Sequence, residues 1–361
     1  MTSRGDGLGV LGGSGRVAVI LTALEVEYTA VREHLTGPLY KLEEHNTLYE
    51  RGAFHNSCCA WTVVLAQTGA GNTTAGVALV RAIAEFDPQV ALFVGVAGAR
   101  KDLDLGDVVA ADAIYDFESG RDTDGDYRPR IKTLPPSYRL VQYAQDVARE
   151  GKWQQRIQPA CPHPPPRAVV KPVAAGATVV AHERSQTAQH LDRHCEDAVA
   201  IEMEGYGFLH GAYVNAHVDA LVIRGISDQL TDKTPTADRH WQPPAAAHAA
   251  AFAFELLDDL AARALEKALL SGKTDQQIAA VRELGRSRHP NAVPLLVKGF
   301  YGTVDFEVSC RIIWALGGLG IDAAKDALLA LNPRYDIEQL TIGDALKGWP
   351  EQPHLQGDDL L

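Results

Sequence analysis

Along the first 270 residues, short apolar runs alternate with segments of helical spacing. The apolar runs predict strands, and the first of them, rich in Val and Ile, is typical of a strand buried on both faces. They lie at 16–24, 61–71, 90–99, 107–117, 168–181 and 218–228. The helical segments lie at 25–35, 72–86, 137–150, 185–194 and 245–270, and the rest of 118–170 predicts loops. This alternation predicts an α/β sheet with helices on both faces.

Two of the predicted strands end in glycine-rich turns, QTGAG at 67–71 and GVAGA at 95–99. In open α/β sheets, ligands bind at the carboxyl ends of the strands. Glycine lets the backbone approach a ligand closely, and Asn72 or Thr73 can cap the helix that follows the first turn. The sequence therefore predicts a ligand site at these two turns.

The pattern changes after about residue 268, where two segments of helical spacing resemble each other. Residues 278–300 and 311–331 align with an offset of about 32, so that Leu284 matches Leu316, and a weaker copy at 343–349 carries Leu346. Each copy predicts a helix, a Leu-Gly turn and a second helix. Paired helices with such a period are typical of an α-solenoid, and the copies resemble HEAT-type repeats. We expect a HEAT-like helical domain at 268–361 that binds an unknown protein partner, with a plain helical domain as the alternative.

The overall composition is that of a globular protein, with 46% hydrophobic and 22% charged residues among 361. The formal net charge of −12 argues against a nucleic-acid binder, which normally carries a basic surface. No stretch has the roughly 18 apolar residues of a membrane span. The Gly/Ser-rich residues 1–15 predict a flexible tail, and we expect a cytoplasmic protein without membrane contact. The 13 histidines show no metal-ligand spacing, so neither a metal nor a cofactor is expected.

Five motifs along residues 16–262 carry a family resemblance. They read AVILTALEVEYTAVREHL, QTGAGNTTAG, FVGVAGARKDLDLGDVV, VAIEMEGYGF and VIRGISD. In order and spacing they resemble the nucleoside phosphorylase and nucleosidase superfamily. Among its branches they are most similar to the methylthioadenosine/S-adenosylhomocysteine nucleosidase-like domains of bacterial conflict and NLR-like proteins.

The resemblance implies a fold, an activity and an assembly. It implies a domain at 16–264 with a mixed central sheet flanked by helices. It implies an N-glycosidase that releases a purine, above all adenine, from a nucleoside or nucleotide by hydrolysis, and a role in anti-phage defence. It also implies a homo-oligomer, a dimer or larger.

Cleavage of a purine–ribose bond requires a proton for the leaving base and a nucleophile for the sugar. Glycoside chemistry generally meets these needs with two carboxyl groups. The resemblance implies that Asp228 protonates purine N7 and that Glu27 activates the attacking water. It also implies that Ser227 orients Asp228 and that Arg224 organises the same turn. Taken alone, Asp228 also fits a turn or cap residue, and Glu27 an acidic residue in a first helical turn.

The stretch AIEMEGYGF at 200–208 places two carboxylates in apolar surroundings. The resemblance assigns Glu204 to the ribose hydroxyls, because a carboxylate can accept several hydrogen bonds, and Met203 to the face of the sugar. Glu202 is expected to be structural. Gly205 and Gly207 are expected to allow close packing where the segment turns into a helix.

The remaining contacts that the resemblance implies lie on the base side and the 5′ side of the substrate. The backbone of Gly71, Ala97 and Gly98 is expected at the substrate, and Val179 and Val180 at the edge of the base. Base stacking and recognition of a charged 5′ group would need further side chains, and the candidates are Trp241 for stacking and His182, Arg184, Lys233, Arg239 and His240 for charge.

Two positions separate hydrolysis from phosphorolysis. Family phosphorylases place an arginine and a hydroxyl residue where this chain has Phe93 and Val96, and neither of these side chains can bind phosphate. The sequence therefore favours water over phosphate as the nucleophile. A purine nucleoside phosphorylase and a catalytically silent ligand-binding module stay open as alternatives.

Overall fold

The computed structural model describes residues 15–56, 59–124, 126–180, 182, 184–229 and 235–347. The predicted tail at 1–15 lies outside them apart from its last residue. The chain divides into two compact units. The sheet unit comprises Gly15–Phe54 and Trp61–Leu257, and the helical unit comprises His55–Ala60 and the chain from Asp258 onward. The sequence-based domain boundary at 264–268 stays a prediction.

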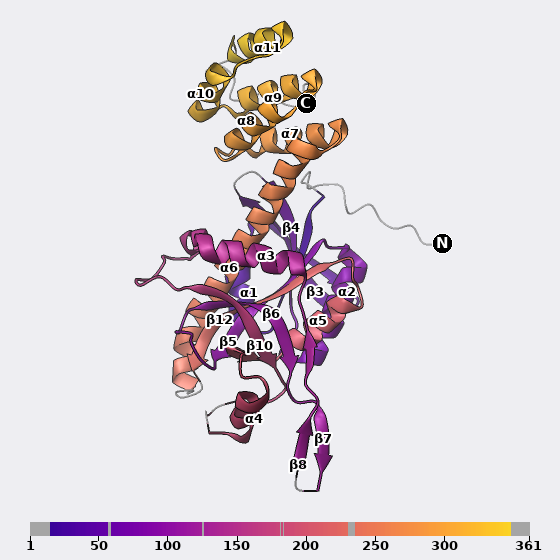
Figure 1. The fold of residues 1–361 in the computed structure, drawn as a ribbon, viewed down its shortest axis with the longest axis vertical. Helices are drawn as coiled ribbons and strands as arrows, with labels where there is room; N and C mark the ends of the chain where they lie inside the picture. The colour runs from indigo at the N-terminus through magenta and orange to yellow at the C-terminus, as the bar shows by residue number, and fades with distance from the viewer. Residues whose placement is uncertain are drawn as a thin grey trace, which may run out of the picture. The chain divides into compact units, whose positions relative to one another are not determined.

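A ten-stranded sheet forms the centre of the sheet unit (Figure 1). Its strands are β1 (Val17–Thr22), β2 (Thr36–Glu44), β3 (Thr47–Asn56), β4 (Cys59–Gln67), β5 (Val90–Ala99), β6 (Val108–Asp116), β9 (Lys132–Leu134), β10 (Ala168–Ala175), β11 (Ala200–Glu202) and β12 (Asp219–Gln229). They lie in the order β11-β10-β6-β12-β5-β1-β4-β3-β2, and β9 pairs with β6. β12 runs parallel to β5 and antiparallel to β6, so the sheet is mixed, as predicted.

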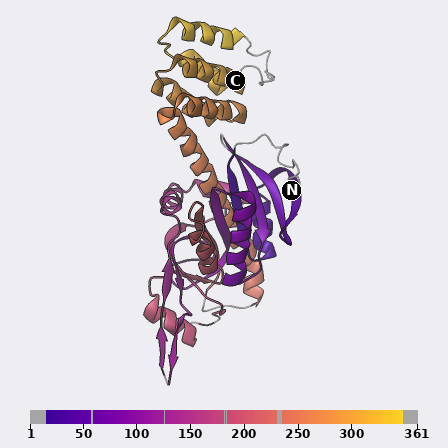
Figure 2. The same ribbon diagram turned by 90° about the vertical axis from the view of Figure 1, so that its right-hand side faces the viewer.

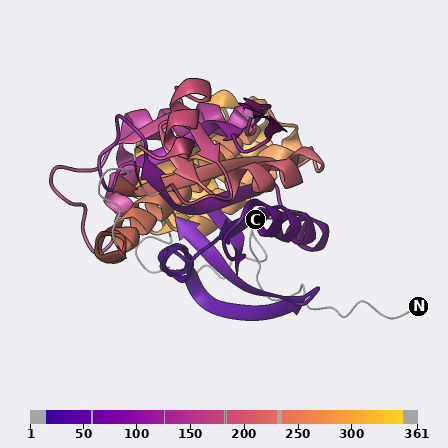
Figure 3. The same ribbon diagram turned by 90° about the horizontal axis from the view of Figure 1, so that it is seen from below.

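The two central strands are buried along almost their whole length. In β5 every residue except Val96 is buried, and in β12 only the first and last residues are partly exposed. Continuous burial requires cover on both faces of a sheet. Helices lie on both sides of it (Figures 2 and 3), which confirms the predicted α/β architecture.

Several strands have no counterpart in the sequence prediction or correct it. β2 and β3 have no predicted counterpart. β2 is polar and largely exposed, so it carries no strand signal. The prediction of loops at 118–136 is wrong, since β9 joins the sheet and β7 (Gly120–Thr123) pairs with β8 (Asp126–Pro129) in a hairpin. Short polar strands lack the apolar alternation that marks a half-buried strand. β10 ends at Ala175, earlier than the predicted residue 181.

The helices of the sheet unit follow the predicted segments closely. They are α1 (Glu25–Arg32), α2 (Asn72–Phe86), α3 (Tyr138–Glu150), α4 (Gln186–His194), α5 (Gly205–Tyr213) and α6 (Pro235–Ser271), with a 3₁₀ helix at Lys152–Arg156. α6 begins ten residues before the predicted start at 245 and continues into the helical unit. Pro243 and Pro244 lie inside it, and prolines usually mark a helix start, which explains the later prediction.

Glycines bring α2 and α5 into close contact. A Cβ on Gly207 would lie 1.7 Å from the carbonyl oxygen of Asn72, and a Cβ on Gly76 would lie 2.8 Å from the carbonyl oxygen of Gly207. The Gly207 N–H also donates to Asn72 Oδ1 at 2.8 Å. A Cβ on Gly205 would lie 2.8 Å from Glu202 Oε1. The expected close packing at Gly205 and Gly207 is therefore confirmed.

The helical unit continues α6 with five shorter helices. They are α7 (Thr274–Ser287), α8 (Ala292–Gly302), α9 (Phe306–Leu319), α10 (Asp322–Ala330) and α11 (Asp336–Lys347). α9 packs against both α7 and α11, and the Asp305 side chain caps α9 by accepting the Glu307 and Val308 N–H groups. Among the helices that the structure describes, none combines the length and apolar character that a bilayer crossing demands.

The predicted Leu-Gly turns are wrong in position. Leu284 and Gly285 lie inside α7, and Leu316 and Gly317 lie inside α9, so the turns fall after Ser287 and Leu319. Gly317 packs against α11, because a Cβ there would lie 3.1 Å from the Ala345 Cβ. Of the third copy at 343–349, residues 348 and 349 lie outside the described part of the chain. The HEAT-like assignment stays a prediction.

Candidate active site

A cavity of about 310 Å³ lies at the carboxyl ends of β1, β5 and β12. Such an edge of an α/β sheet is the expected place for a ligand. Nine of the predicted site residues line it, and they are Glu27, Ala97, Gly98, Val179, Val180, Met203, Glu204, Ser227 and Asp228. Residues from seven separate segments of the chain are thus brought to one cavity.

Two predicted substrate contacts lie behind the wall of the cavity. Arg224 has no exposed surface, and neither Arg224 nor Gly71 is among the described residues that line the cavity. Both bind the Glu204 carboxylate, each at a different oxygen. The Gly71 N–H donates to Glu204 Oε1 at 2.9 Å, and Arg224 Nη2 donates to Glu204 Oε2 at 3.0 Å. The structure places these two residues as supports of Glu204.

Arg224 joins three buried carboxylates. Besides Glu204 it donates from Nη2 to Glu202, and its Nη1 lies 4.0 Å from Glu27 Oε1. Its guanidinium lies over the Phe93 ring at 4.7 Å from the centroid. A Cβ on Gly95 would lie 2.4 Å from both Arg224 Nη1 and Glu27 Oε1, so only glycine leaves room for this arrangement.

The surroundings of this cluster raise the pKa of two of its carboxyl groups, Glu27 and Glu202. Burial raises the pKa of Glu27 above its ordinary value, although Arg224 and three backbone N–H donors act in the opposite direction. Burial likewise raises the pKa of Glu202, against the effect of Arg224. For Arg224, burial acts to lower the pKa, but the three surrounding carboxylates outweigh it and raise the pKa. A raised pKa makes a carboxylate a stronger base.

Backbone donors fix the Glu27 carboxylate. Oε2 accepts the Ala23 and Leu24 N–H groups at 2.7 and 2.8 Å, and Oε1 accepts the Val96 N–H at 2.8 Å. The bond to Leu24 satisfies a free donor at the start of α1, as an acidic residue in a first helical turn commonly does. The bond to Val96 instead reaches across to β5. Glu27 thus caps its helix and also faces the cavity.

Asp228 lies near the end of β12, beside an irregularity in the pairing of that strand with β5. Ser227 Oγ donates to Asp228 Oδ1 at 3.0 Å, the contact that was expected. A Cβ on Gly98 would lie 2.9 Å from Asp228 Oδ2, so glycine gives this carboxyl group its space. The Asp228 side chain therefore reaches the cavity with one oxygen oriented by Ser227.

Glu202 has the structural contacts that were expected. Its Oε2 accepts the Glu204 N–H at 3.0 Å and its Oε1 accepts the Gly205 N–H at 2.9 Å, so it holds the start of α5. It also forms part of the cavity wall. Sequence reasoning missed other wall residues, namely Ala23, Leu24, Ala70, Thr178, Ile201 and Gln242. Most of these adjoin a motif, and Gln242 directly follows Trp241, the stacking candidate.

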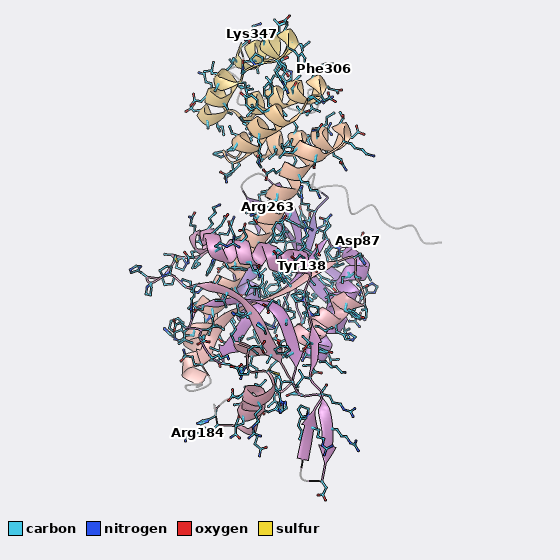
Figure 4. The ribbon with its side chains drawn as sticks, in the orientation of Figure 1. Asp87, Tyr138, Arg184, Arg263, Phe306 and Lys347 are labelled. Carbon is cyan, nitrogen blue, oxygen red and sulfur yellow. The ribbon has the colours of Figure 1, made fainter. Side chains whose placement is uncertain are left out.

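Of the candidates for stacking and for charge whose side chains the structure describes, none lines this cavity. Trp241 and His240 line a second hollow of about 950 Å³ between α1, residues 157–162 and the start of α6. The two cavities share Leu24 and Gln242. Arg184 projects at the surface before α4 (Figure 4), and His182 is also exposed.

The two cavities are acidic rather than basic over their described surfaces. No lysine or arginine of the described side chains lines either of them. Lys233 and the side chain of Arg239 lie outside the part of the chain that the structure describes. A 5′ phosphate contact from those two residues stays a prediction.

Comparison with known proteins agrees with this fold. A model of the phosphorylase superfamily matches residues 17–262. The ATP nucleosidase Cap17 of Escherichia coli (strain KTE188) is 30% identical over 181 residues, which are 46% of this chain and 36% of that protein. The chain thus matches little more than a third of the length of that relative.

Solved structures share the fold at lower identity. The methylthioadenosine/S-adenosylhomocysteine nucleosidase of Colwellia psychrerythraea, in complex with adenine, has a TM-score of 0.57 at 20% identity and covers 69% of this chain and 98% of its own. The futalosine hydrolase of Helicobacter pylori has a TM-score of 0.55 at 20% identity and covers 68% of this chain and 98% of its own. With its matched family model spanning residues 17–262, this chain belongs to the phosphorylase superfamily.

Proposed function

We propose that the sheet unit hydrolyses the N-glycosidic bond of a purine nucleoside or nucleotide, with adenine as the preferred base. The observation that carries the proposal is the convergence of Glu27, Glu204 and Asp228 on one cavity of about 310 Å³. A cavity of this size can hold a small molecule. Three carboxyl groups with different surroundings supply the separate roles that glycoside hydrolysis needs.

In the proposed reaction, Asp228 gives its proton to N7 of the base while the bond from C1′ to N9 breaks. The electron pair of that bond leaves with the base. A water molecule adds its oxygen to C1′ and gives a proton to Glu27, so the products are the free base and ribose. Glu204 accepts hydrogen bonds from the ribose hydroxyls, with Met203 against the sugar. Arg224 and Gly71 hold Glu204 in place through the bonds described above.

Water is favoured over phosphate as the nucleophile by the surroundings of two side chains. Phe93 is buried beneath Arg224 and packs edge to face on Phe208, so it offers nothing to an anion. Val96 lines the cavity with an aliphatic side chain. No described lysine or arginine lines the wall, so a phosphate ion would meet no cationic side chain there.

Product analysis tests the proposal. Purified protein is incubated with methylthioadenosine, adenosylhomocysteine, adenosine, AMP, ATP, inosine and NAD, with and without inorganic phosphate. We expect release of adenine together with free ribose or its 5′ derivative, independent of phosphate. Strict dependence on phosphate, with a sugar 1-phosphate as product, would establish a phosphorylase instead. ATP belongs in the panel because the relative Cap17 is named as an ATP nucleosidase.

For the helical unit we propose a regulatory or protein-binding role. Large apolar side chains are exposed at the starts of α9 and α11, among them Phe306, Ile337 and Leu340. Helical arrays commonly bind other proteins, and exposed large apolar side chains favour such contacts. A defence role and a homo-oligomeric state remain proposals that accompany this one.

A further inference from the structure

One wall of the inner cavity is formed by an irregular loop between β10 and α4. Thr178, Val179 and Val180 of this loop line the cavity. The described residues between Ala175 and Gln186 belong to no helix or strand. Their backbone is therefore not held by a regular ladder of hydrogen bonds, and other contacts must fix the wall.

Glu118 supplies those contacts from the corner that follows β6. Its Oε2 accepts the Ala177 N–H at 2.6 Å, and its Oε1 accepts the Thr178 N–H at 2.9 Å. Both oxygens of one carboxylate thus hold two consecutive backbone donors directly before the cavity wall. Hydrogen bonds to an ionised acceptor are stronger than neutral ones.

The corner at Glu118 is itself anchored by neighbouring elements. Tyr127 on β8 donates from its hydroxyl to the Glu118 carbonyl oxygen at 2.6 Å. Gly120 leaves room for that ring, because a Cβ there would lie 2.2 Å from it. On the other side, His190 of α4 lies with Nε2 3.0 Å from the Phe117 carbonyl oxygen.

The loop after β10 also packs tightly against the Phe117–Glu118 corner. A Cβ on Gly176 would lie 2.3 Å from the Phe117 ring and 3.0 Å from the Glu118 carboxyl carbon. Gly176 in turn donates its N–H to the Glu202 carbonyl oxygen at 3.1 Å. The loop is therefore clamped between the Phe117–Glu118 corner and the strand that leads to Met203 and Glu204.

We propose that Glu118 is a positioning residue that fixes the Thr178–Val180 wall against which the base binds. Its carboxylate binds the Ala177 and Thr178 N–H groups, so it acts through the loop backbone. Loss of the carboxylate frees two donors and loosens the wall. Binding of the substrate and of the transition state then weaken together, which raises KM and leaves kcat nearly unchanged. The identity of the group that binds at the wall rests on the proposed function. The two hydrogen bonds by which Glu118 holds the loop do not.

Two variants and one control test this role. Glu118→Ala removes both acceptors, and Glu118→Gln keeps one acceptor oxygen but turns an NH2 group toward the second donor. Glu196→Ala is the matched control, because Glu196 is an exposed carboxylate whose partner is Lys101 at 2.8 Å, away from the loop. The first measurement is hydrogen exchange of the Ala177 and Thr178 amides in ligand-free protein. The second is kcat and KM for base release.

We expect Glu118→Ala to speed the exchange of each of the two amides by about tenfold. KM should also rise by about tenfold, while kcat stays within about threefold of wild type. Glu118→Gln should fall between Glu118→Ala and wild type, and Glu196→Ala should match wild type. Unchanged exchange in Glu118→Ala would overturn the proposal, and so would faster exchange without a rise in KM. A wild-type protein that releases no base would overturn the proposed function alone, since exchange would still decide whether Glu118 holds the loop.

Discussion

Arg224 donates from Nη2 to Glu204 Oε2 at 3.0 Å, and both side chains are buried. This pair connects the carboxylate that faces the cavity to the core of the sheet. Because Arg224 also faces Glu202 and Glu27, one guanidinium is shared by three carboxyl groups. The geometry of the candidate site therefore depends on a residue that does not line the cavity.

Replacing Arg224 by methionine should destabilise the protein strongly. The change leaves buried carboxylates without their cation, and removal of one partner of a buried pair costs about 3–5 kcal/mol. Urea unfolding monitored by circular dichroism measures the effect. Arg263→Met is the control, because Arg263 pairs with Asp259 at 3.0 Å on an exposed helical surface, where such a pair contributes about 0–1 kcal/mol. Equal stabilities of the two variants would contradict the role given to Arg224.

Gly95→Ala should disturb the same cluster from the backbone side. The new methyl group would lie 2.4 Å from Arg224 Nη1 and from Glu27 Oε1, so the ion pair or the strand must move. We expect a loss of about 1–3 kcal/mol in the free energy of unfolding together with a fall in kcat. Gly318→Ala in α9 provides the comparison, since nothing lies within 4 Å of its added Cβ. There, alanine should be neutral or slightly stabilising.

Glu27 gives stability a defined dependence on pH. Burial raises its pKa above the ordinary value of 4.5, so above pH 4.5 the folded protein retains a proton that the unfolded chain has lost. The free energy of unfolding should then decrease as the pH rises through this window. Glu27→Gln removes this contribution and should flatten the curve, measured by urea unfolding between pH 4.5 and 8. If the free energy of unfolding of Glu27→Gln fell more steeply with pH than that of wild type, the predicted direction of the Glu27 contribution would be wrong.

The same property predicts how activity responds to acid. If Glu27 is the water base, kcat should fall on acidification through a pKa above 4.5, since the protonated carboxyl cannot accept the proton of water. Steady-state rates of base release across the pH range measure the midpoint. Glu27→Gln should lose most activity at every pH. An unaltered rate in that variant would remove Glu27 from the mechanism.

Asp228→Asn should lower kcat by about 10²–10⁴-fold, because an amide cannot donate the proton that the leaving base needs. Folding should be nearly unaffected, as the substitution preserves shape. Ser227→Ala removes only the bond to Asp228 Oδ1 and should cost far less. The measurement is the rate of adenine release by the two variants. Full activity in Asp228→Asn would show that Asp228 is not the general acid.

The sequence by itself determined the central strands, the helices beside them and the glycine turn after β4, whereas the turn predicted at 95–99 is wrong because those residues belong to β5. These features depend on local periodicity, so β5 and α2 were predicted with the bounds that the structure has. The motifs by themselves also indicated Glu27, Glu204 and Asp228 as candidate site residues. β2 and the hairpin of β7 and β8 were missed, because exposed polar strands carry no apolar alternation, whereas β3 was missed although its Tyr49 and Phe54 are buried.

Only the tertiary structure decided how the candidates are supported. Arg224 proved to be the buried partner of three carboxyl groups, and Trp241 was placed in the outer hollow rather than at the inner cavity. Glu118 carried no sequence signal, since its two bonds reach residues 59 and 60 positions away. Contacts between distant segments depend on how the strands and helices pack, and that packing is not encoded in the local pattern of any single segment.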